Sequence, residues 1–557
     1  MSASSKKKLR KELEAVRMTE RQEKERKEEK KAKLYTTIFA VVMVAIVLIV
    51  AAAMIFNHFK SSGYFTKNTI AAVTGEHEIN NVEMSYFFND AIETQYNQWT
   101  EDYGNYLSLY TSMWGLDLTK PLDDQKYSDD MTWADFFVEQ AMGAAKETYA
   151  LYDQATAEGF TLTEEQEKEI ETIMSNVSMY ASIYAGGDLD AYLVALYGYG
   201  ANEASYREYQ RVSKIASAYY NAKADSLEYT ADAIKAHNDK NPAAYNSYSF
   251  NAYFVYADDY LSGGTTAEDG TVTYSDEEKE AARAAAEATA NELAKATTVI
   301  ELDQKIAALE INKDKTVSSD AYKDRLYSSL PTSFQEWMTA EGRKIGDITV
   351  IADREAVEEH EHEEGEEHSE EEGEILGYYV VIFNGVKFNN EPLANVRHLL
   401  VSFEGGTYDS TTGTTTYSDE EKAAAKETAE KYLNEWKEGE ATEATFIDLV
   451  KKYTDDEASA ETGGLYEEIT PASNYVENFL NWAIDPDRKA GNVEIVETEY
   501  GYHIMYYSSD DELTYRQYMI RNDLKAADME EWYGSIVDPA TITEKDYSYL
   551  MLNRSIT

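Results

Sequence analysis

The spacing of apolar and polar residues changes twice along the chain. Residues 34–59 contain no Asp, Glu, Lys or Arg, and their core of about 21 apolar residues is long enough to cross a bilayer as a helix. Between 60 and 245, apolar residues recur at helical spacing, as at Met84, Phe88 and Ile92. From 246 onward, short apolar runs typical of strands alternate with amphipathic helices. The pattern predicts a transmembrane helix, an all-α module and then an α+β region.

The segment before the apolar run is basic. Residues 1–34 hold 13 Lys or Arg and 7 Asp or Glu, and such basic flanks stay on the cytoplasmic side of a membrane. We therefore expect a cytoplasmic segment at 1–34, a transmembrane helix at 35–59 and the remainder outside the cytoplasm. A cleaved signal peptide is the alternative, because the run Ala51–Ala53 offers small residues to a peptidase.

Capping signals divide the module at 60–245 into separate helices. A strand and turn at 70–79 lead to Asn80 or Asn81, either of which can cap the following helix. A helix over 132–158 is expected to end at Gly159, and Thr163 with Gln166 predicts a capping box for the next one. Further helices are expected at 203–227 and 228–245.

A long internal repeat organises the second half of the chain. The segment GGTTAEDGTVTYSDEEKEAARAAAE at 263–287 nearly recurs as GGTYDSTTGTTTYSDEEKAAAKETAE at 405–430, and GYYVV at 377–381 parallels GYHIM at 501–505. Both long segments place Ser before a helix with Glu three residues later, at Ser275/Glu278 and Ser418/Glu421. We therefore read 246–388 as a first copy and 389–510 as a second copy of one domain, followed by a helical tail at 511–557.

The second copy carries an ordered set of motifs. They are RHLLV with His398, then YTDD, Gly463–Gly464, Phe479, and GYHI with His503. This set resembles the parvulin family of peptidyl-prolyl cis/trans isomerases. The segments YDQATAEGFTLTEEQ and EYTADAIKAHNDKNPAAY resemble the amino-terminal chaperone modules of PrsA- and SurA-type proteins. The resemblance implies an antiparallel sheet covered by helices at 418–437 and 442–453, with the two histidines side by side on its central strands.

The parvulin resemblance also implies roles for individual residues. His398 and His503 match the paired sheet histidines, Thr498 matches the hydroxyl beside the second one, and Asp456 matches the acidic residue near the substrate carbonyl, with Asp455 as the alternative. Phe479 matches the wall of the proline pocket; Tyr475 and Val476 stand where the family often has Met and Gln. Rotation about an X–Pro bond breaks no covalent bond, so neither a nucleophile nor a cofactor is expected.

The first copy departs from the motif set where chemistry would occur. Tyr253 is expected in place of His398 and Tyr379 in place of His503, which predicts a folded, non-catalytic binding module. Before its last strand lies an acidic insertion at 355–375. Its His360, His362 and His368 are a weak candidate site for a divalent cation. A solvated acidic loop is the alternative interpretation.

The amino-acid composition argues against several classes of function. The 557 residues carry a formal net charge of −53 and no Cys, which argues against nucleic-acid binding and excludes disulfides and thiolate chemistry. We expect a single-pass membrane protein of a Gram-positive-like cell envelope that isomerises prolines in unfolded secreted polypeptides. A non-catalytic holdase chaperone and a cation-binding surface protein are the alternatives.

Overall fold

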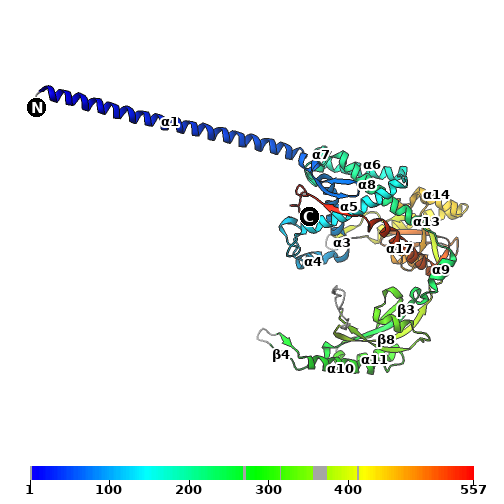
Figure 1. Ribbon diagram of the computed structural model, residues 1–557. Helices are drawn as coiled ribbons and strands as arrows, with labels where there is room; N and C mark the ends of the chain where they lie inside the picture. The colour runs from blue at the N-terminus through cyan, green and yellow to red at the C-terminus, as the bar shows by residue number, and fades with distance from the viewer. Residues whose placement is uncertain (1–2, 267–270, 314, 356–372, 410–412, 557) are drawn as a thin grey trace. The chain divides into compact units, whose positions relative to one another are not determined.

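The computed structural model describes residues 3–266, 271–313, 315–355, 373–409 and 413–556 (Figure 1). The chain divides into two compact units. The first unit comprises Met1–Leu227 with Ala527–Thr557, and the second comprises Glu228–Ala526. The chain therefore leaves the first unit, builds the whole of the second, and returns.

The chain begins with one long helix, α1 (Ala3–Ser61). Its part Lys33–Ser61 is 29 residues long, and within the described residues it is the one helix long and apolar enough to cross a membrane. The side chains described from Leu34 to Phe59 are exposed. A turn at Ser62–Gly63 and the short helix α2 (Tyr64–Asn68) lead into the rest of the first unit.

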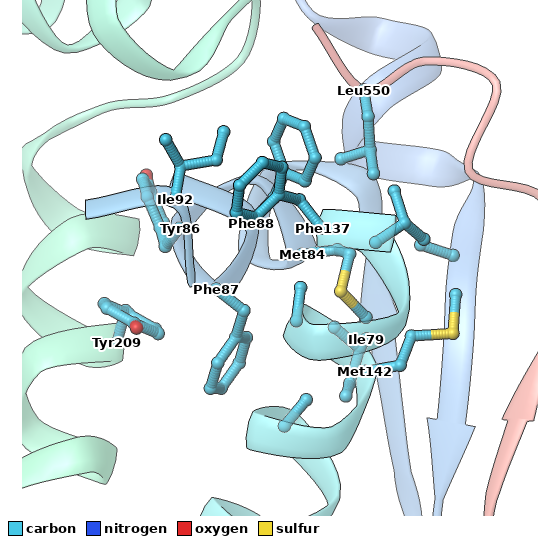
Figure 2. Close-up of a cluster of buried hydrophobic side chains, with 14 of the residues drawn as sticks. Ile79, Met84, Tyr86, Phe87, Phe88, Ile92, Phe137, Met142, Tyr209 and Leu550 are labelled. Atoms are coloured by element: carbon cyan, nitrogen blue, oxygen red, sulfur yellow. The ribbon is translucent and has the colours of Figure 1, made fainter. Parts of the chain in front are cut away.

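Packed helices form most of the first unit, together with a small sheet. The helices are α3 (Asn81–Tyr103), α4 (Leu107–Met113), α5 (Trp133–Ala157), α6 (Glu164–Tyr184), α7 (Leu189–Tyr197) and α8 (Glu203–Asp225). The predicted caps are confirmed: Asn80 accepts hydrogen bonds from two backbone amides at the start of α3, and Thr163 with Gln166 forms a capping box on α6. Figure 2 shows the core, in which Met84 and Phe88 of α3 meet Phe137 of α5.

The end of the chain completes this first unit. The sheet has the order β15–β1–β2, formed by β15 (Ile542–Glu544), β1 (Ile70–Thr74) and β2 (His77–Asn80). Ala72 pairs with Glu544 in an antiparallel register, and Leu550 is buried in the same core as Phe88 (Figure 2). The helix α17 (Tyr515–Val537) precedes β15. The carboxyl-terminal tail is thus helical at first and then supplies a strand.

The second unit contains two four-stranded antiparallel sheets of the same strand order. The first sheet has the order β6 (Asp320–Leu326), β3 (Ser247–Tyr256), β8 (Ile375–Lys387) and β7 (Ile348–Arg354). The second has the order β12 (Leu465–Ile469), β9 (Pro392–Ser402), β14 (Gly501–Thr514) and β13 (Val493–Glu497). The predicted fold class, a helical module followed by two α+β domains of one design, is confirmed.

Equivalent helices cover the two sheets. One face is covered in the first copy by α10 (Asp276–Leu293) and α11 (Val299–Ala307), and in the second by α13 (Asp419–Glu438) and α14 (Glu443–Tyr453). The opposite face packs against α12 (Thr332–Thr339) and α16 (Glu477–Ala483), respectively. Both predicted capping boxes, at Ser275 and Ser418, start the long helices.

Shorter elements complete the second unit. Each copy has a two-stranded hairpin before its long helix, a helix of eight residues precedes the first copy, and a helix of four residues follows α14. These elements are α9 (Ala231–Asn238), β4 (Thr265–Thr266), β5 (Val272–Thr273), β10 (Thr407–Asp409), β11 (Thr414–Thr416) and α15 (Glu457–Ala460). The acidic insertion with His360, His362 and His368 lies outside the described residues.

The strand register corrects the expected counterpart of His398. In the second copy His398 lies opposite Met505, and in the first copy Ala252 lies opposite Val381, which corresponds to Met505 in the repeat. Ala252 therefore occupies the position of His398. Tyr253 points to the other face of the sheet, where it packs with the core beneath α10 and α11. The prediction was wrong by one residue, and a shift of one residue exchanges the faces of a strand.

Candidate active site

The two histidines meet on the central strands of the second sheet. His398 lies on β9 and His503 on β14, with His503 opposite Leu400, so both side chains project from the same face. The two Nδ1 atoms lie 2.9 Å apart. Both side chains are buried, with 3% and 5% of their surface exposed. The predicted meeting of the imidazoles is therefore present in the structure.

A continuous chain of hydrogen bonds runs through this pair. His398 Nε2 lies 3.0 Å from Asp456 Oδ2 at one end, and His503 Nε2 lies 2.9 Å from Thr498 Oγ1 at the other. An ionised Asp456 only accepts, so His398 Nε2–H donates to it. With both rings neutral, His503 Nδ1–H then donates to His398, and the Thr498 hydroxyl donates to His503. One assignment of protons thus satisfies every group in the chain.

The surroundings favour this protonation state. Burial, and the neighbouring His398, hold the pKa of His503 well below its ordinary value. Hydrogen bonding from His398, reinforced by Ser459 and Tyr466, keeps the pKa of Asp456 far below its usual range. Near neutral pH, His503 is therefore uncharged and Asp456 is ionised.

Two further hydroxyls hold the carboxylate of Asp456. The Ser459 hydroxyl donates to Oδ2, and so does the Tyr466 hydroxyl, at 3.2 Å. Burial and the adjacent Asp456 raise the pKa of Tyr466 to about 12, so it remains a donor. Neither Ser459 nor Tyr466 was predicted from the sequence. Ser459 could have been, because it lies three residues after Asp456 at the start of a helical turn, where side chains commonly hydrogen-bond to the capping residue.

The YTDD loop separates the roles of its two aspartates. Thr454 Oγ1 accepts hydrogen bonds from Leu400 N and Asp456 N, each at 3.1 Å, and so ties the loop to β9. Asp455 uses its carboxylate to accept from Ser402 N at 2.8 Å, at the end of that strand. Asp456 is the one that faces the imidazoles. The geometry therefore favours Asp456 over the alternative Asp455.

Gly464 allows the strand edge to approach His398. Its carbonyl accepts the His398 backbone N–H at 2.9 Å, and its φ of +69° lies in the left-handed region. A Cβ placed on Gly464 would overlap the His398 carbonyl oxygen. Gly464, the second glycine of the pair, is thus required by the backbone that carries the first histidine.

Aromatic rings form one side of the site. The Phe479 ring centroid lies 5.4 Å from that of His398 and 5.6 Å from that of His503, both edge to face. Tyr475 lies 5.4 Å from both Phe479 and Tyr466. Phe479 is buried, whereas Tyr475 and Val476 are half-buried at the start of α16. The structure thus places the predicted pocket residues together beside the histidine pair.

Within the described part of the chain, no group of three or more His, Asp or Glu side chains is arranged to hold a metal ion. The three histidines of the acidic insertion are not among those residues.

Comparison with known proteins identifies the domain that holds this site. Residues 378–509 match the family model described as the PPIC-type PPIase domain. The chain contains a PPIC-type PPIase domain. The match confirms the parvulin resemblance; it begins within β8 of the first copy and continues through β9 to β13 and most of β14. A comparison with curated proteins finds no match.

Several solved structures are similar to part of the chain. PrsA from Bacillus cereus is 26% identical, with a TM-score of 0.17, over 27% of this chain and 50% of that one. PrsA from Bacillus subtilis is 24% identical, with a TM-score of 0.18, over 28% and 52%. A SurA-like chaperone from Campylobacter jejuni is 19% identical, with a TM-score of 0.15, over 28% and 57%. The chain thus spans only about half the length of these structures, and such TM-scores do not bear on function.

Proposed function

We propose that the second copy catalyses cis/trans isomerisation of X–Pro bonds in unfolded polypeptides. The observation that carries the proposal is the hydrogen-bonded chain Asp456–His398–His503–Thr498 beside the Phe479 ring, within a PPIC-type PPIase domain. The site offers a carboxylate and an apolar wall but requires no covalent intermediate. That set matches a reaction whose barrier is loss of amide resonance.

The chemistry follows from the electronic change on twisting. A planar X–Pro amide carries negative charge on its oxygen through resonance, and the twisted amide loses that charge. The ionised Asp456 next to the substrate carbonyl would repel the planar form more than the twisted form, which lowers the barrier selectively. Phe479 and Tyr475 would hold the proline ring in an apolar setting. The histidine pair would position Asp456 and exclude water.

The energy required of the site is modest. Uncatalysed exchange takes roughly 10–100 s, and a thousandfold acceleration requires about 4 kcal/mol of transition-state stabilisation. One partly buried carboxylate at the carbonyl and a complementary apolar surface for the proline ring are of sufficient magnitude. A carboxylate that is partly shielded from water interacts more strongly than an exposed one because the local dielectric is lower.

We further propose that the protein is held in the membrane by α1, with the isomerase outside the cytoplasm and unfolded secreted polypeptides as clients. The apolar length of α1 and the basic segment before it support this orientation. The first copy would bind the same clients without catalysis. In support, the face equivalent to the active site holds Tyr379, with its ring centroid 4.5 Å from that of Phe254 and 5.1 Å from that of Phe334.

The decisive test measures proline exchange with the full chain in detergent micelles. A tetrapeptide with one X–Pro bond serves as substrate, and exchange is followed by NMR. Asp456→Asn is expected to lower kcat/KM by about 10- to 100-fold, equivalent to about 1.4–2.7 kcal/mol. The matched control is Tyr379→Phe at the equivalent of His503 in the first copy, which is expected to leave the rate unchanged.

The holdase alternative makes a different prediction. If the wild type and a His398→Ala/His503→Ala double variant exchange the peptide at equal rates while both suppress aggregation of a reduced, unfolded protein, the domain is a holdase. Loss of exchange with retained suppression of aggregation supports the isomerase.

A further inference from the structure

One stretch of the first unit is nearly free of charge. From Thr172 to Asn202, the 31 residues contain only Asp188 and Asp190 as charged side chains, whereas the chain average of 28% would give about nine. The same stretch contains five tyrosines. In a protein with a net charge of −53, such a segment differs sharply from the rest of the surface. The low charge of this stretch does not serve solubility, which points to a surface that it contacts.

The structure places this stretch at an exposed end of the first unit. It forms the second half of α6, the turn after it, and α7. Ile183 is 63% exposed and Tyr184 is 73% exposed. We call the exposed apolar side chains here the tyrosine tip; its members are Met179, Tyr180, Ile183, Tyr184, Leu196 and Tyr199. None of the six belongs to the buried core of the unit. Met174 of α6 and Leu193 of α7 are among the residues of these two helices that pack into that core.

The tyrosine tip adjoins the outer end of α1. Phe56 and Lys60 of α1 line a cavity of about 620 Å³ together with Val194 of α7 and Tyr199. Figure 1 shows α7 beside the carboxyl-terminal end of α1. A Cβ on Gly63 would overlap the backbone of Gly200, so the two chain segments touch directly.

Aromatic rings continue from the apolar helix into the first unit. Phe56 lies 5.5 Å from Phe65, which stacks on Tyr549 with centroids also 5.5 Å apart. The Thr66 hydroxyl donates to the carbonyl oxygen of Tyr199. The end of the apolar run, the start of the folded unit and the edge of the tyrosine tip are thus held together by backbone and ring contacts. The distances between these three segments are therefore set by the fold of the first unit.

These contacts set the level of the tip relative to a bilayer. The apolar run of α1 ends at Phe59, and Lys60 is the first charged residue after it. Tyr199, which lines the same cavity as Phe56 and Lys60, therefore lies near the depth of the headgroups when α1 spans a membrane. Tyrosine favours that depth because its ring is apolar and its hydroxyl is polar.

Charge explains why this surface is the one that can approach lipid. Anionic headgroups repel acidic protein surfaces over about a Debye length. The stretch that carries the tyrosine tip has only two charged residues, both aspartates, while the rings and aliphatic side chains of the tip gain free energy from leaving water.

We propose that the tyrosine tip lies in the headgroup layer of the membrane that α1 spans, so that the first unit is held against the lipid surface at two points. The partner is the outer leaflet itself. This inference rests on the proposed anchoring by α1. Its consequence is that the first unit does not swing freely on its transmembrane helix but keeps one side turned toward the lipid.

The absence of cysteine makes a direct test possible, because any single cysteine can be labelled uniquely. Full-length protein carrying Ile183→Cys, Met113→Cys or Val44→Cys is labelled with a nitrobenzoxadiazole dye and placed in nanodiscs of phosphatidylcholine and phosphatidylglycerol. Met113 is the matched control, since it is 72% exposed on α4, which Figure 1 shows well away from the end of α1. A lipid spin-labelled near its headgroup is the quencher.

We expect quenching at position 183 to exceed that at position 113 at least threefold. Equal quenching at 183 and 113, with position 44 quenched by a lipid labelled deep in its chain, overturns the inference and leaves the anchor intact. No quenching at 44 overturns both. A dye at 183 that responds to a reduced, unfolded protein but not to the lipid quencher shows a client-binding surface and also overturns the inference.

A charge insertion provides a second measurement. With the dye on Leu196→Cys as reporter, the pair Ile183→Glu/Tyr184→Glu is expected to lower lipid quenching at least twofold. The matched pair Tyr106→Glu/Met113→Glu, at two equally exposed positions around α4, is expected to have no effect. Both variants should keep the wild-type proline exchange rate. Unchanged quenching in the first pair contradicts membrane contact by the tip.

Discussion

The two copies in the second unit share a scaffold and differ on one face of their sheets. On the face under the long helix, both sheets bury aliphatic residues, among them Val255 and Val380 in the first copy and Leu399 and Ile504 in the second. On the opposite face, the first copy buries Ala252 and aromatic rings, whereas the second buries two imidazoles, a hydroxyl and part of a carboxylate. One face preserves the fold while the other is free to change chemistry.

The difference also shows what a buried polar site requires. His398 and His503 are tolerated in the second copy because each ring nitrogen has a partner. The two Nδ1 atoms partner each other, and the partners of the two Nε2 atoms come from outside the central strands, namely from the YTDD segment and the residue after β13. In the first copy the segment after α11 instead supplies Asn312, which donates to the Tyr253 hydroxyl at 2.9 Å on the other face. The loops, more than the strands, separate the two copies.

The substitution expected to change the second copy most strongly, relative to the first, is at Gly464. Gly464→Ala introduces both a left-handed alanine and an overlap with the His398 carbonyl, so we expect a loss of at least about 3 kcal/mol in the stability of the second copy. Gly413→Ala is the control, because Gly413 has the same φ of +69° but nothing within 4 Å of an added Cβ. It should cost about 1–2 kcal/mol. Calorimetry of the full chain measures both, and equal losses would show that the overlap is relieved.

Acid is expected to unfold the second copy before the first. His503 has a lowered pKa in the folded state, so below its ordinary value near 6.5 the unfolded chain binds a proton that the folded site refuses. Stability from this group is therefore full above about pH 6.5 and falls by up to about 1.4 kcal/mol per pH unit below it. The lowered pKa of Asp456 adds a further loss below about pH 4.

Tyr379 at the equivalent position has a raised pKa and does not titrate in acid. Hydrogen exchange of the full chain between pH 7 and 4.5, corrected for intrinsic rates, should show strands β9 and β14 losing protection while β3 and β8 keep it. Parallel loss in both sheets would contradict the role of the buried imidazole.

A smaller effect is expected from Tyr466→Phe. The substitution removes one hydrogen bond to Asp456 but leaves those from His398 and Ser459, so the pKa of Asp456 should rise and exchange activity should fall about two- to fivefold. The acid limb of the pH–rate profile should move to higher pH. Tyr475→Phe is the control, since the structure assigns its hydroxyl no bond to Asp456. An identical shift in both variants would locate the effect in ring packing instead.

No gain of activity is expected from placing histidines on the first copy. Ala252→His/Tyr379→His, built in the inactive His398→Ala/His503→Ala background, restores the imidazole positions but not the loop that carries Asp456 and Ser459. Proline exchange should stay at the uncatalysed rate. Measurable activity would show that the pair alone suffices and that the YTDD loop is dispensable.

Local features were predictable from the sequence, and long-range ones only in part. Caps at Asn80, Thr163 and Ser418 depend on neighbours within four residues, and each occurs as expected. The meeting of His398 with His503 followed from family resemblance, not from spacing. The error at Tyr253 arose because the run AYFVY has apolar residues on both faces, so its alternation does not fix a register. Tyr466 was missed because its position beside Asp456 depends on the pairing of β12 with β9, and Ser459 because its position depends on the short helix α15.

The return of the chain from α17 to β15 has a consequence for biosynthesis. Strand β1 pairs with a strand that lies some 470 residues later in the chain. The amino-terminal sheet, although its first strands are synthesised early, can therefore be completed only after the rest of the chain has been made. During synthesis, the PPIase domain would emerge and fold while the amino-terminal sheet still lacks its final strand. Trimming the last fifteen residues should therefore damage the beginning of the molecule and spare the middle.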